Sequence, residues 1–144
     1  TNRGGVVATF NVTLSYNLTS TQWVDIDTEN VTGLNPQENR TLTFSWNTTG
    51  LTLYANYTLR AYATPLPGEI NTIDNTLTAT RQVKLPGDTN GDRRVNYKDL
   101  GLLAVSYGSK TGQPNYQADA DFNLDGRIDY KDLGAMAVNY GKTV

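Results

Sequence analysis

Two twelve-residue segments of this chain place oxygen-bearing side chains at the same alternating positions. The first, DTNGDRRVNYKD, runs from Asp88 to Asp99, and the second, DFNLDGRIDYKD, runs from Asp121 to Asp132. Alternate positions of a tightly wound loop bring their oxygens to one centre, and the hard cation Ca²⁺ binds six to eight oxygens at about 2.3–2.6 Å. The spacing therefore predicts two calcium sites, one in each segment, which we call loop 1 and loop 2.

Each predicted site takes its oxygens from positions 1, 3, 5, 7, 9 and 12 of its loop, and position 7 contributes a backbone carbonyl. The ligands are Asp88, Asn90, Asp92, the Arg94 carbonyl, Asn96 and Asp99 in loop 1, and Asp121, Asn123, Asp125, the Arg127 carbonyl, Asp129 and Asp132 in loop 2. Because several carboxylates in one loop repel each other until a divalent ion neutralises them, we expect this part of the chain to be largely unfolded without calcium. Loop 2 has Gly126 and the additional Asp129, so we expect it to bind calcium more tightly than loop 1.

An internal repeat extends beyond the loops and supplies the helices that position them. Residues 87–108 and 120–141 are identical at 13 of 22 aligned positions. Apolar residues at helical spacing follow each loop and predict a core face on each helix. These residues are Leu100, Leu103, Ala104 and Tyr107, and then Leu133, Met136, Ala137 and Tyr140. No amphipathic helix precedes either loop, so each repeat is half of an EF-hand.

The tandem pair of loop-helix repeats, over about residues 87–142, resembles a type I dockerin. The resemblance implies a module that folds around two calcium ions and binds a cohesin module. It also implies that Val95 and Ile128, at position 8, pair the two loops through a short backbone bridge. Arg93 departs from the pattern because Gly is usual at position 6, and a left-handed backbone there costs about 1 kcal/mol or more for Arg.

The outward sites of the two predicted helices indicate a protein partner. Apolar residues on an outward face require a cover, which is either the N-terminal part of this chain or another molecule. The Tyr-Lys pair at positions 10 and 11 of each loop departs from the small hydroxyls of many dockerins, so the identity of the partner does not carry over. The candidate partner-binding residues are Tyr97, Lys98, Leu102, Val105, Tyr130, Lys131, Ala135 and Val138.

Residues 1–85 alternate between apolar and polar side chains, which is typical of half-buried strands. The clearest segments are FNVTLSYNL, TLTFSWN, NYTLRAYA and TLTATRQVKL, with weaker strands at 22–27 and 30–32. Phe10, Leu42 and Leu77 belong to the predicted core set, whereas Ser15 belongs to the solvent set. The expected fold is an all-β immunoglobulin-like sandwich over 1–85, followed by a small all-α dockerin-like module with two calcium loops over 86–144.

The N-terminal part resembles the CARDB family, an immunoglobulin-like sandwich of bacterial and archaeal surface proteins. The resemblance rests on VTGLNPQENRTLTFSWNTTG and NYTLRAYATPLPGEINTIDNT, and it implies a spacer or adhesion module without an active site. Such sandwiches normally begin with one more strand than the nine residues before Phe10 allow. We therefore expect Gly5–Thr9 either to fold back as a substitute strand or to complete a neighbour's sheet. We favour the exchange between subunits, which would build a filament or sheath.

Six N-x-[S/T] sequences in the N-terminal part predict N-linked glycans and an extracellular or cell-surface protein. The acceptor residues are Asn11, Asn17, Asn30, Asn39, Asn47 and Asn56. The alternation pattern places Asn11, Asn17, Asn47 and Asn56 on the solvent side of their strands.

Composition narrows the remaining classes of function. The net charge is −2 and the 12 basic residues are scattered, which argues against nucleic acid as a partner. No apolar run is long enough to span a bilayer, and the chain contains neither Cys nor His. We expect a non-enzymatic, calcium-stabilised assembly protein whose partner is either another copy of itself or a cohesin. A glycan-binding fragment of a carbohydrate-active enzyme is the alternative, and it would depend on Trp23 or on acid pairs such as Asp25 with Asp27.

Overall fold

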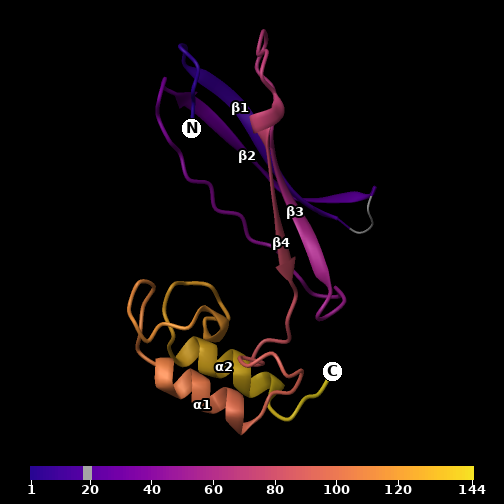
Figure 1. Cartoon of the computed structure of the whole chain (residues 1–144), viewed down its shortest axis with the longest axis vertical. Helices are drawn as coiled ribbons and strands as arrows, with labels where there is room; N and C mark the ends of the chain where they lie inside the picture. The colour runs from indigo at the N-terminus through magenta and orange to yellow at the C-terminus, as the bar shows by residue number, and fades with distance from the viewer. Residues whose placement is uncertain (18–20) are drawn as a thin grey trace. The chain divides into compact units, whose positions relative to one another are not determined.

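In the computed structural model of the chain, residues 1–17 and 21–144 are described. They form two compact units, Thr1–Val83 and Lys84–Val144. The first contains an antiparallel β-sheet and the second contains two α-helices (Figure 1). The expected fold class, an all-β module followed by a small helical module, is confirmed at this level.

The sheet of the first unit has four antiparallel strands in the order β2-β1-β3-β4. The strands are β1 (Ala8–Asn17), β2 (Trp23–Leu34), β3 (Asn56–Ala63) and β4 (Thr76–Gln82), and a short 3-10 turn, Ile73–Asn75, precedes β4. The two weaker strands expected at 22–27 and 30–32 form one continuous strand, β2. The last predicted residue of the first strand, Leu18, lies outside the described residues.

The second layer of the predicted sandwich is a single extended segment, 40–47. Its side chains alternate as expected, with Leu42, Phe44 and Trp46 half-buried, but it pairs with no strand in the described part of the chain. Trp46 packs against Tyr16 and Tyr57, with ring centroids 5.3 and 5.7 Å apart. Aromatic packing, rather than a hydrogen-bonded ladder, therefore holds this layer on the sheet. The prediction of a paired strand over 41–47 is wrong.

Strand β4 is exposed along its whole length. Leu77, which the alternation pattern assigned to the core, is 72% exposed. A sheet residue becomes buried only when a second layer lies over it, and the extended segment does not cover Leu77. Val83 and Leu85, which follow β4, are buried as expected.

The opposite face of the sheet also contains a covered site. Ser15 is 1% exposed, although the alternation pattern assigned it to solvent. The Arg60 guanidinium lies 4.2 Å from the centroid of the Trp23 ring, and Ser15 pairs with Arg60 in the sheet register. These long side chains cover the small Ser15, whose hydroxyl donates to Asp25 at 2.7 Å. A period-2 sequence pattern does not show when long side chains on neighbouring strands bury a small residue between them.

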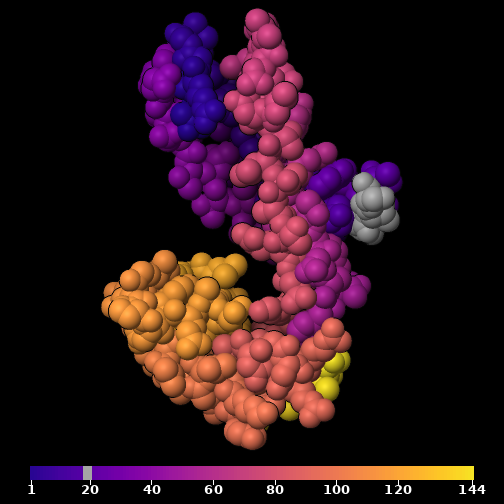
Figure 2. All heavy atoms as spheres, in the orientation of Figure 1, coloured from indigo at the N-terminus to yellow at the C-terminus, as the bar shows by residue number. Residues whose placement is uncertain are grey.

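The N-terminal residues are tied to their own module by Asn2. Its side-chain amide donates to the carbonyls of Val6 at 2.8 Å and Leu34 at 2.9 Å, and its backbone pairs with Gln37 and Glu38. The substitute strand expected over Gly5–Thr9 forms only from Ala8 onward, where β1 begins. Between this N-terminal segment and the loop around residue 70 the sheet is open to a cavity of about 650 Å³ (Figure 2), with Phe10, Val31 and Leu42 among its lining residues.

The second unit contains α1 (Tyr97–Ser106), α2 (Tyr130–Asn139) and a 3-10 turn, Ala118–Ala120. Asn96 and Asp129 are the N-caps of α1 and α2, and each forms a capping box with the aspartate three residues later. Gly87 begins the first repeat with φ 104°, and a Cβ there would lie 2.8 Å from Val95 Cγ1. Glycine is therefore required at this position by both backbone conformation and packing.

The buried face of each helix includes one residue of the predicted core set, Leu103 in α1 and Met136 in α2, but is otherwise different from the face that the apolar spacing predicted. The buried residues are Asp99, Leu103 and Ser106 in α1, and Asp132, Met136 and Asn139 in α2. The expected core residues Ala104, Tyr107, Ala137 and Tyr140 are exposed, and Leu100 and Leu133 are 38% and 39% exposed. The cause is the loop aspartate: once Asp99 or Asp132 points into its loop, residues three, four and seven positions later must also point inward.

The backbone pairing between the repeats also differs from the expected bridge. Val95 exchanges hydrogen bonds with residues 141 and 142, which follow α2, whereas Ile128 exchanges them with residues 108 and 109, which follow α1. Val95 and Ile128 are both fully buried, but their backbone groups do not pair with each other. Each loop is thus held by the end of the other repeat's helix, and the expected bridge between Val95 and Ile128 is wrong.

Candidate metal centre

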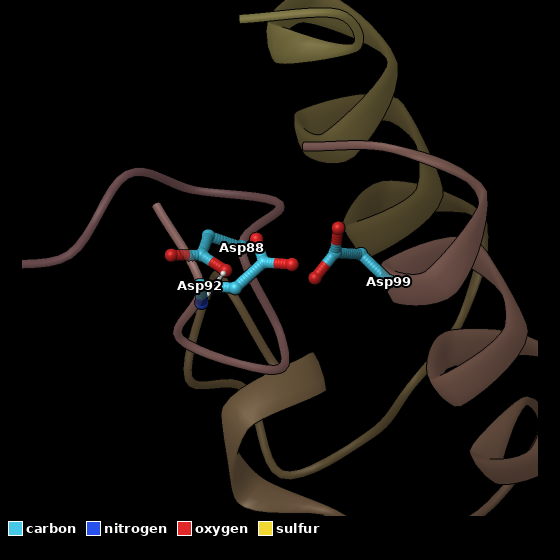
Figure 3. Close-up of side chains that lie close together, drawn as sticks. All are labelled: Asp88, Asp92 and Asp99. Atoms are coloured by element: carbon cyan, nitrogen blue, oxygen red, sulfur yellow. Dashed lines mark hydrogen bonds between the residues drawn. The ribbon is translucent and has the colours of Figure 1, made fainter. Parts of the chain in front are cut away.

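Loop 1 brings three carboxylates to one point. Asp88, Asp92 and Asp99 each offer an oxygen, and these oxygens all lie within 4.8 Å of one another (Figure 3). Asp88 and Asp92 come from the loop, whereas Asp99 reaches back from the first turn of α1. Carboxylates at this spacing repel one another even in water. Asp88 and Asp99 are buried, and the lower dielectric constant away from water makes their repulsion stronger.

Backbone amides fix the two buried carboxylates of loop 1. Asp88 accepts hydrogen bonds from the amides of Gly91, Asp92 and Arg93 at 2.9–3.1 Å. Asp99 accepts from the amides of Asn90 and Asn96. These backbone hydrogen bonds by themselves wind the loop around its carboxylates. Gly91 and Arg93 adopt the left-handed φ values, 76° and 68°, that this winding needs. Arg93 therefore adopts the left-handed conformation to which the sequence analysis assigned a cost.

Loop 2 repeats the same framework. Asp121 accepts hydrogen bonds from the amides of Asp125 and Gly126, and Asp132 accepts from those of Phe122, Asn123 and Asp129. Asp121 and Asp132 are 3% and 0% exposed. Leu124 and Gly126 take the left-handed positions, with φ 57° and 80°. The two loops thus share the placement of their first and last carboxylates.

The donor set of loop 1 fits calcium. Carboxylate, amide and carbonyl oxygens are hard ligands, and the alternating loop supplies several of them around one point. The Asn90 side-chain oxygen accepts one hydrogen bond, from the Asp92 amide, while its nitrogen donates to the Asp92 carboxylate, so one lone pair of that oxygen remains for a metal ion. Asn123 has the same orientation relative to Asp125. Bound calcium would neutralise the carboxylates, and these asparagines, Arg94, Asn96, Arg127 and Asp129 remain proposed ligands.

Two contacts of loop 2 were not anticipated from the sequence. The Tyr116 hydroxyl donates to Asp121 Oδ2 at 2.7 Å, which raises the pKa of the Tyr116 hydroxyl. The Lys131 ammonium lies 2.9 Å from Asp125 Oδ2, and this hydrogen bond lowers the pKa of the Asp125 carboxyl. Tyr116 is five residues before the loop, outside the repeat, and no spacing rule marks it. Lys131 was assigned to the partner face alone.

The comparisons with known proteins match this part of the chain. Residues 86–138 match the family model described as the dockerin type I domain. A solved chain described as a type II cohesin-dockerin domain from Bacteroides cellolosolvens is 41% identical, and the match covers 42% of this chain and 92% of that chain, with a TM-score of 0.37. The C-terminal unit belongs to the type I dockerin family. Membership of this family explains why the loop and the helix each occur twice. We call this unit the dockerin domain.

Two further solved chains are similar to most of this chain at low sequence identity. Two mutants of a type II cohesin-X-dockerin complex from Acetivibrio cellulolyticus match 92% of this chain and 83% of the solved chain. Their identities are 13% and 14%, and their TM-scores are 0.38 and 0.39. No curated protein matches the chain. The resemblance of residues 10–85 to the CARDB family stays a prediction.

The outer surface of the dockerin domain is apolar along both helices. Tyr97 and Val105 on α1 are 71% and 69% exposed, and Tyr130 and Val138 on α2 are 69% and 76% exposed. Lys98 and Lys131 are also exposed. Leu102 and Ala135 are half-buried, so their expected outward orientation is wrong, for the same reason that shifts the core face.

None of the helices in the described part of the chain has the length and apolar character that crossing a membrane requires.

The candidate glycan acceptors lie on the first unit. Asn11, Asn30, Asn39, Asn47 and Asn56 are exposed. Asn17 is half-buried and its side-chain oxygen accepts from the Thr58 amide at 2.6 Å, while Thr19 of its sequence motif lies outside the described residues. Asn11 and Asn30 face each other across β1 and β2, and the Asn30 amide donates to Asn11 at 2.7 Å.

Calcium removal provides the first test. We expect a chelator to abolish most of the helical circular dichroism and to leave the β-sheet signal. Once calcium is removed, no buried side-chain cation among the described residues of the dockerin domain neutralises its loop carboxylates, so their repulsion opposes folding. Asp99→Asn should remove one of two calorimetric binding events. Asp119→Asn, in an exposed ion pair with Lys84 outside the loops, is the matched control and should keep both. Full helicity in the metal-free protein would contradict the expectation.

Proposed function

We propose that this chain is a calcium-stabilised, non-enzymatic docking protein whose dockerin domain binds a cohesin-like module outside the cell. The observation that carries the proposal is the exposed apolar stripe on each helix next to a loop that fits calcium. Isolated exposed apolar residues need no explanation, but a continuous apolar stripe on a small module is typical of an interaction surface. Membership of the dockerin family supplies the class of partner.

The geometry of the stripe suits a helix face that lies against a partner. Tyr97, Gly101 and Val105 lie four residues apart on α1, and Tyr130, Gly134 and Val138 repeat this spacing on α2. Residues four apart share one side of a helix. A Cβ added at Gly101 or Gly134 would meet nothing within 4 Å, so the middle of each stripe is open. A partner surface can approach the helix backbone there.

The stripe is tested by replacing its valines. Val105→Ser with Val138→Ser should weaken cohesin binding by about tenfold or more, since buried apolar anchors carry most of the energy of an interface. Surface plasmon resonance against a panel of cohesins measures the affinity. Because the two faces repeat each other, each single variant keeps one complete face, and the double variant is decisive. Thr143→Ser, outside both stripes, is the control.

An unchanged affinity in the double variant, with calcium binding intact, would contradict this assignment of the face. Absence of binding to every cohesin in calcium would contradict the class of partner.

N-linked glycosylation is the second part of the proposal. Five exposed acceptors support it, because a glycan can attach there without disturbing the core. We expect peptide mass mapping of native protein to find glycans at Asn39, Asn47 and Asn56, and none at Asn17, whose side chain supports the Thr58 backbone. A native mass equal to that of the polypeptide would refute glycosylation.

A structural subunit of a filament or sheath is the second candidate function. The specific observation is the incomplete β module, in which 40–47 has no strand partner in the described residues and β4 is a fully exposed edge. Unpaired strands are templates for pairing with another copy. The tie of Asn2 to residues 34–38 argues against exchange of the N-terminal residues, so pairing along β4 is the favoured route.

This second candidate predicts large particles at high protein concentration. Leu77→Lys with Ala79→Lys should convert them to monomers, since charges on an edge strand oppose pairing. The same two residues are exposed, so the free energy of unfolding should change little. Analytical ultracentrifugation in calcium measures the particle size. A wild-type chain that stays monomeric would exclude assembly by itself.

The alternative of glycan binding loses its best residue. Trp23 is half-buried, and the Arg60 guanidinium covers its ring at 4.2 Å. Glycan-binding aromatic residues need a free ring face, so the Trp23 contact favours packing. Both members of the acid pair are already engaged, because Asp25 accepts from the Ser15 hydroxyl and Asp27 accepts from the Thr28 amide.

A further inference from the structure

The ammonium of Lys131 lies at a point of loop 2 where the sequence analysis predicted a calcium ion and no side-chain cation. Its Nζ is 2.9 Å from Asp125 Oδ2, and the two side chains are 51% and 30% exposed. The other oxygen, Asp125 Oδ1, accepts from the Arg127 amide at 3.0 Å. The oxygen that faces Lys131 is therefore the one that the backbone leaves for a metal ion.

Loop 1 has the same residues at these positions but not the same contact. Lys98 occupies position 11 and Asp92 position 5, yet no ion pair joins them in the described part of the chain, where three such pairs are found. Asp92 Oδ1 accepts from the Arg94 amide at 3.0 Å, as in loop 2. Two loops with the same backbone contact at position 5 thus differ in the charge beside it.

The carboxylates of the two loops differ accordingly. Those of Asp88, Asp92 and Asp99 converge within 4.8 Å, whereas Asp121, Asp125 and Asp132 form no such group among the described residues. The Tyr116 hydroxyl holds Asp121 Oδ2, and Lys131 holds Asp125 Oδ2. Loop 1 is arranged to receive a cation, and loop 2 already contains part of the compensating charge.

We propose that Lys131 is an internal counter-ion of loop 2, so that calcium fills loop 1 first and enters loop 2 only as it displaces the Lys131 ammonium. This inference rests on the proposed calcium-dependent docking function and concerns its regulation. It reverses the expectation from sequence that loop 2, with Gly126 and Asp129, is the tighter site.

The order of filling has a consequence for the docking face. Lys131 follows Tyr130, the exposed residue that begins the α2 stripe. While Lys131 binds Asp125, its charge is directed to the loop rather than to a partner. Calcium in loop 2 releases the ammonium next to Tyr130, so the α2 face gains a free positive charge only when both loops are filled. The α1 face has no corresponding restraint on Lys98 in the described structure.

The test follows each loop separately in full-length protein by ¹⁵N NMR during a calcium titration. The amides of Gly91 in loop 1 and Gly126 in loop 2 are the reporters. In wild type, Gly91 should respond at lower calcium than Gly126. Lys131→Met should raise the affinity of loop 2 by about two- to fivefold more than Lys98→Met raises that of loop 1, as expected for loss of one exposed ion pair.

Lys98→Met is the matched control, because it removes the same charge from the same position of the other repeat. The difference between the two variants isolates the ion pair from the general effect of lowering positive charge near a calcium site. A second readout is the half-loaded state: at calcium concentrations where Gly91 but not Gly126 has responded, the Lys131 ammonium resonance should be protected from exchange with water, and it should lose that protection when loop 2 fills.

If the Gly126 amide responds at lower calcium than the Gly91 amide, or if the two lysine variants change the affinities of their loops equally, the counter-ion role is wrong. Calcium-dependent docking would remain intact in either case. A failure of both glycine amides to respond to calcium would instead refute the proposed function itself. The expected result is sequential filling in wild type and nearly simultaneous filling in Lys131→Met.

Discussion

The last carboxylate of each loop is the constraint on which the dockerin domain depends. Asp99 and Asp132 are fully buried. Each accepts hydrogen bonds from backbone amides of its own loop and also closes the capping box of the helix that follows. One side chain therefore fixes the loop, the start of the helix and its rotation about its axis. Because that rotation turns Leu103 and Met136 inward, it leaves Tyr97, Val105, Tyr130 and Val138 outside. The proposed docking surface is thus a consequence of how the last carboxylate closes the loop.

The β module depends on a weaker constraint. Its four-stranded sheet is complete in hydrogen bonding between neighbouring strands, but only one extended segment, packed through Trp46, forms the second layer. Half-buried aromatic residues can hold such a layer in place without a ladder, and they leave its backbone groups for water or for another strand. The proposed contacts of the two units therefore differ in kind: side chains of the dockerin domain, and backbone edges of the β module.

The pseudo-symmetry of the dockerin domain is incomplete where its chemistry is concerned. The two repeats are identical at 13 of 22 positions, and their loops take left-handed conformations at the same two positions. The Lys131 contact with Asp125 nevertheless has no counterpart at Lys98 among the described ion pairs. Exposed lysines have long, flexible side chains, so small differences in their surroundings decide where the charge lies. Two copies of one motif can therefore bind calcium with different affinities although their ligands match.

The sequence by itself determined the two-module organisation, the duplicated loops and the alternation of β1, because twelve-residue ligand spacing and period-2 patterns are local properties. It also marked Arg93 as the loop residue that would carry a cost in a left-handed conformation, which the structure then showed. Only the tertiary structure decided which helix face is buried, since the inward direction of Asp99 outweighs the apolar spacing of Leu100 and Ala104. It likewise decided that Leu77 is exposed and that Val95 pairs with residues 141 and 142, because cover and pairing over such distances depend on what the rest of the chain places there.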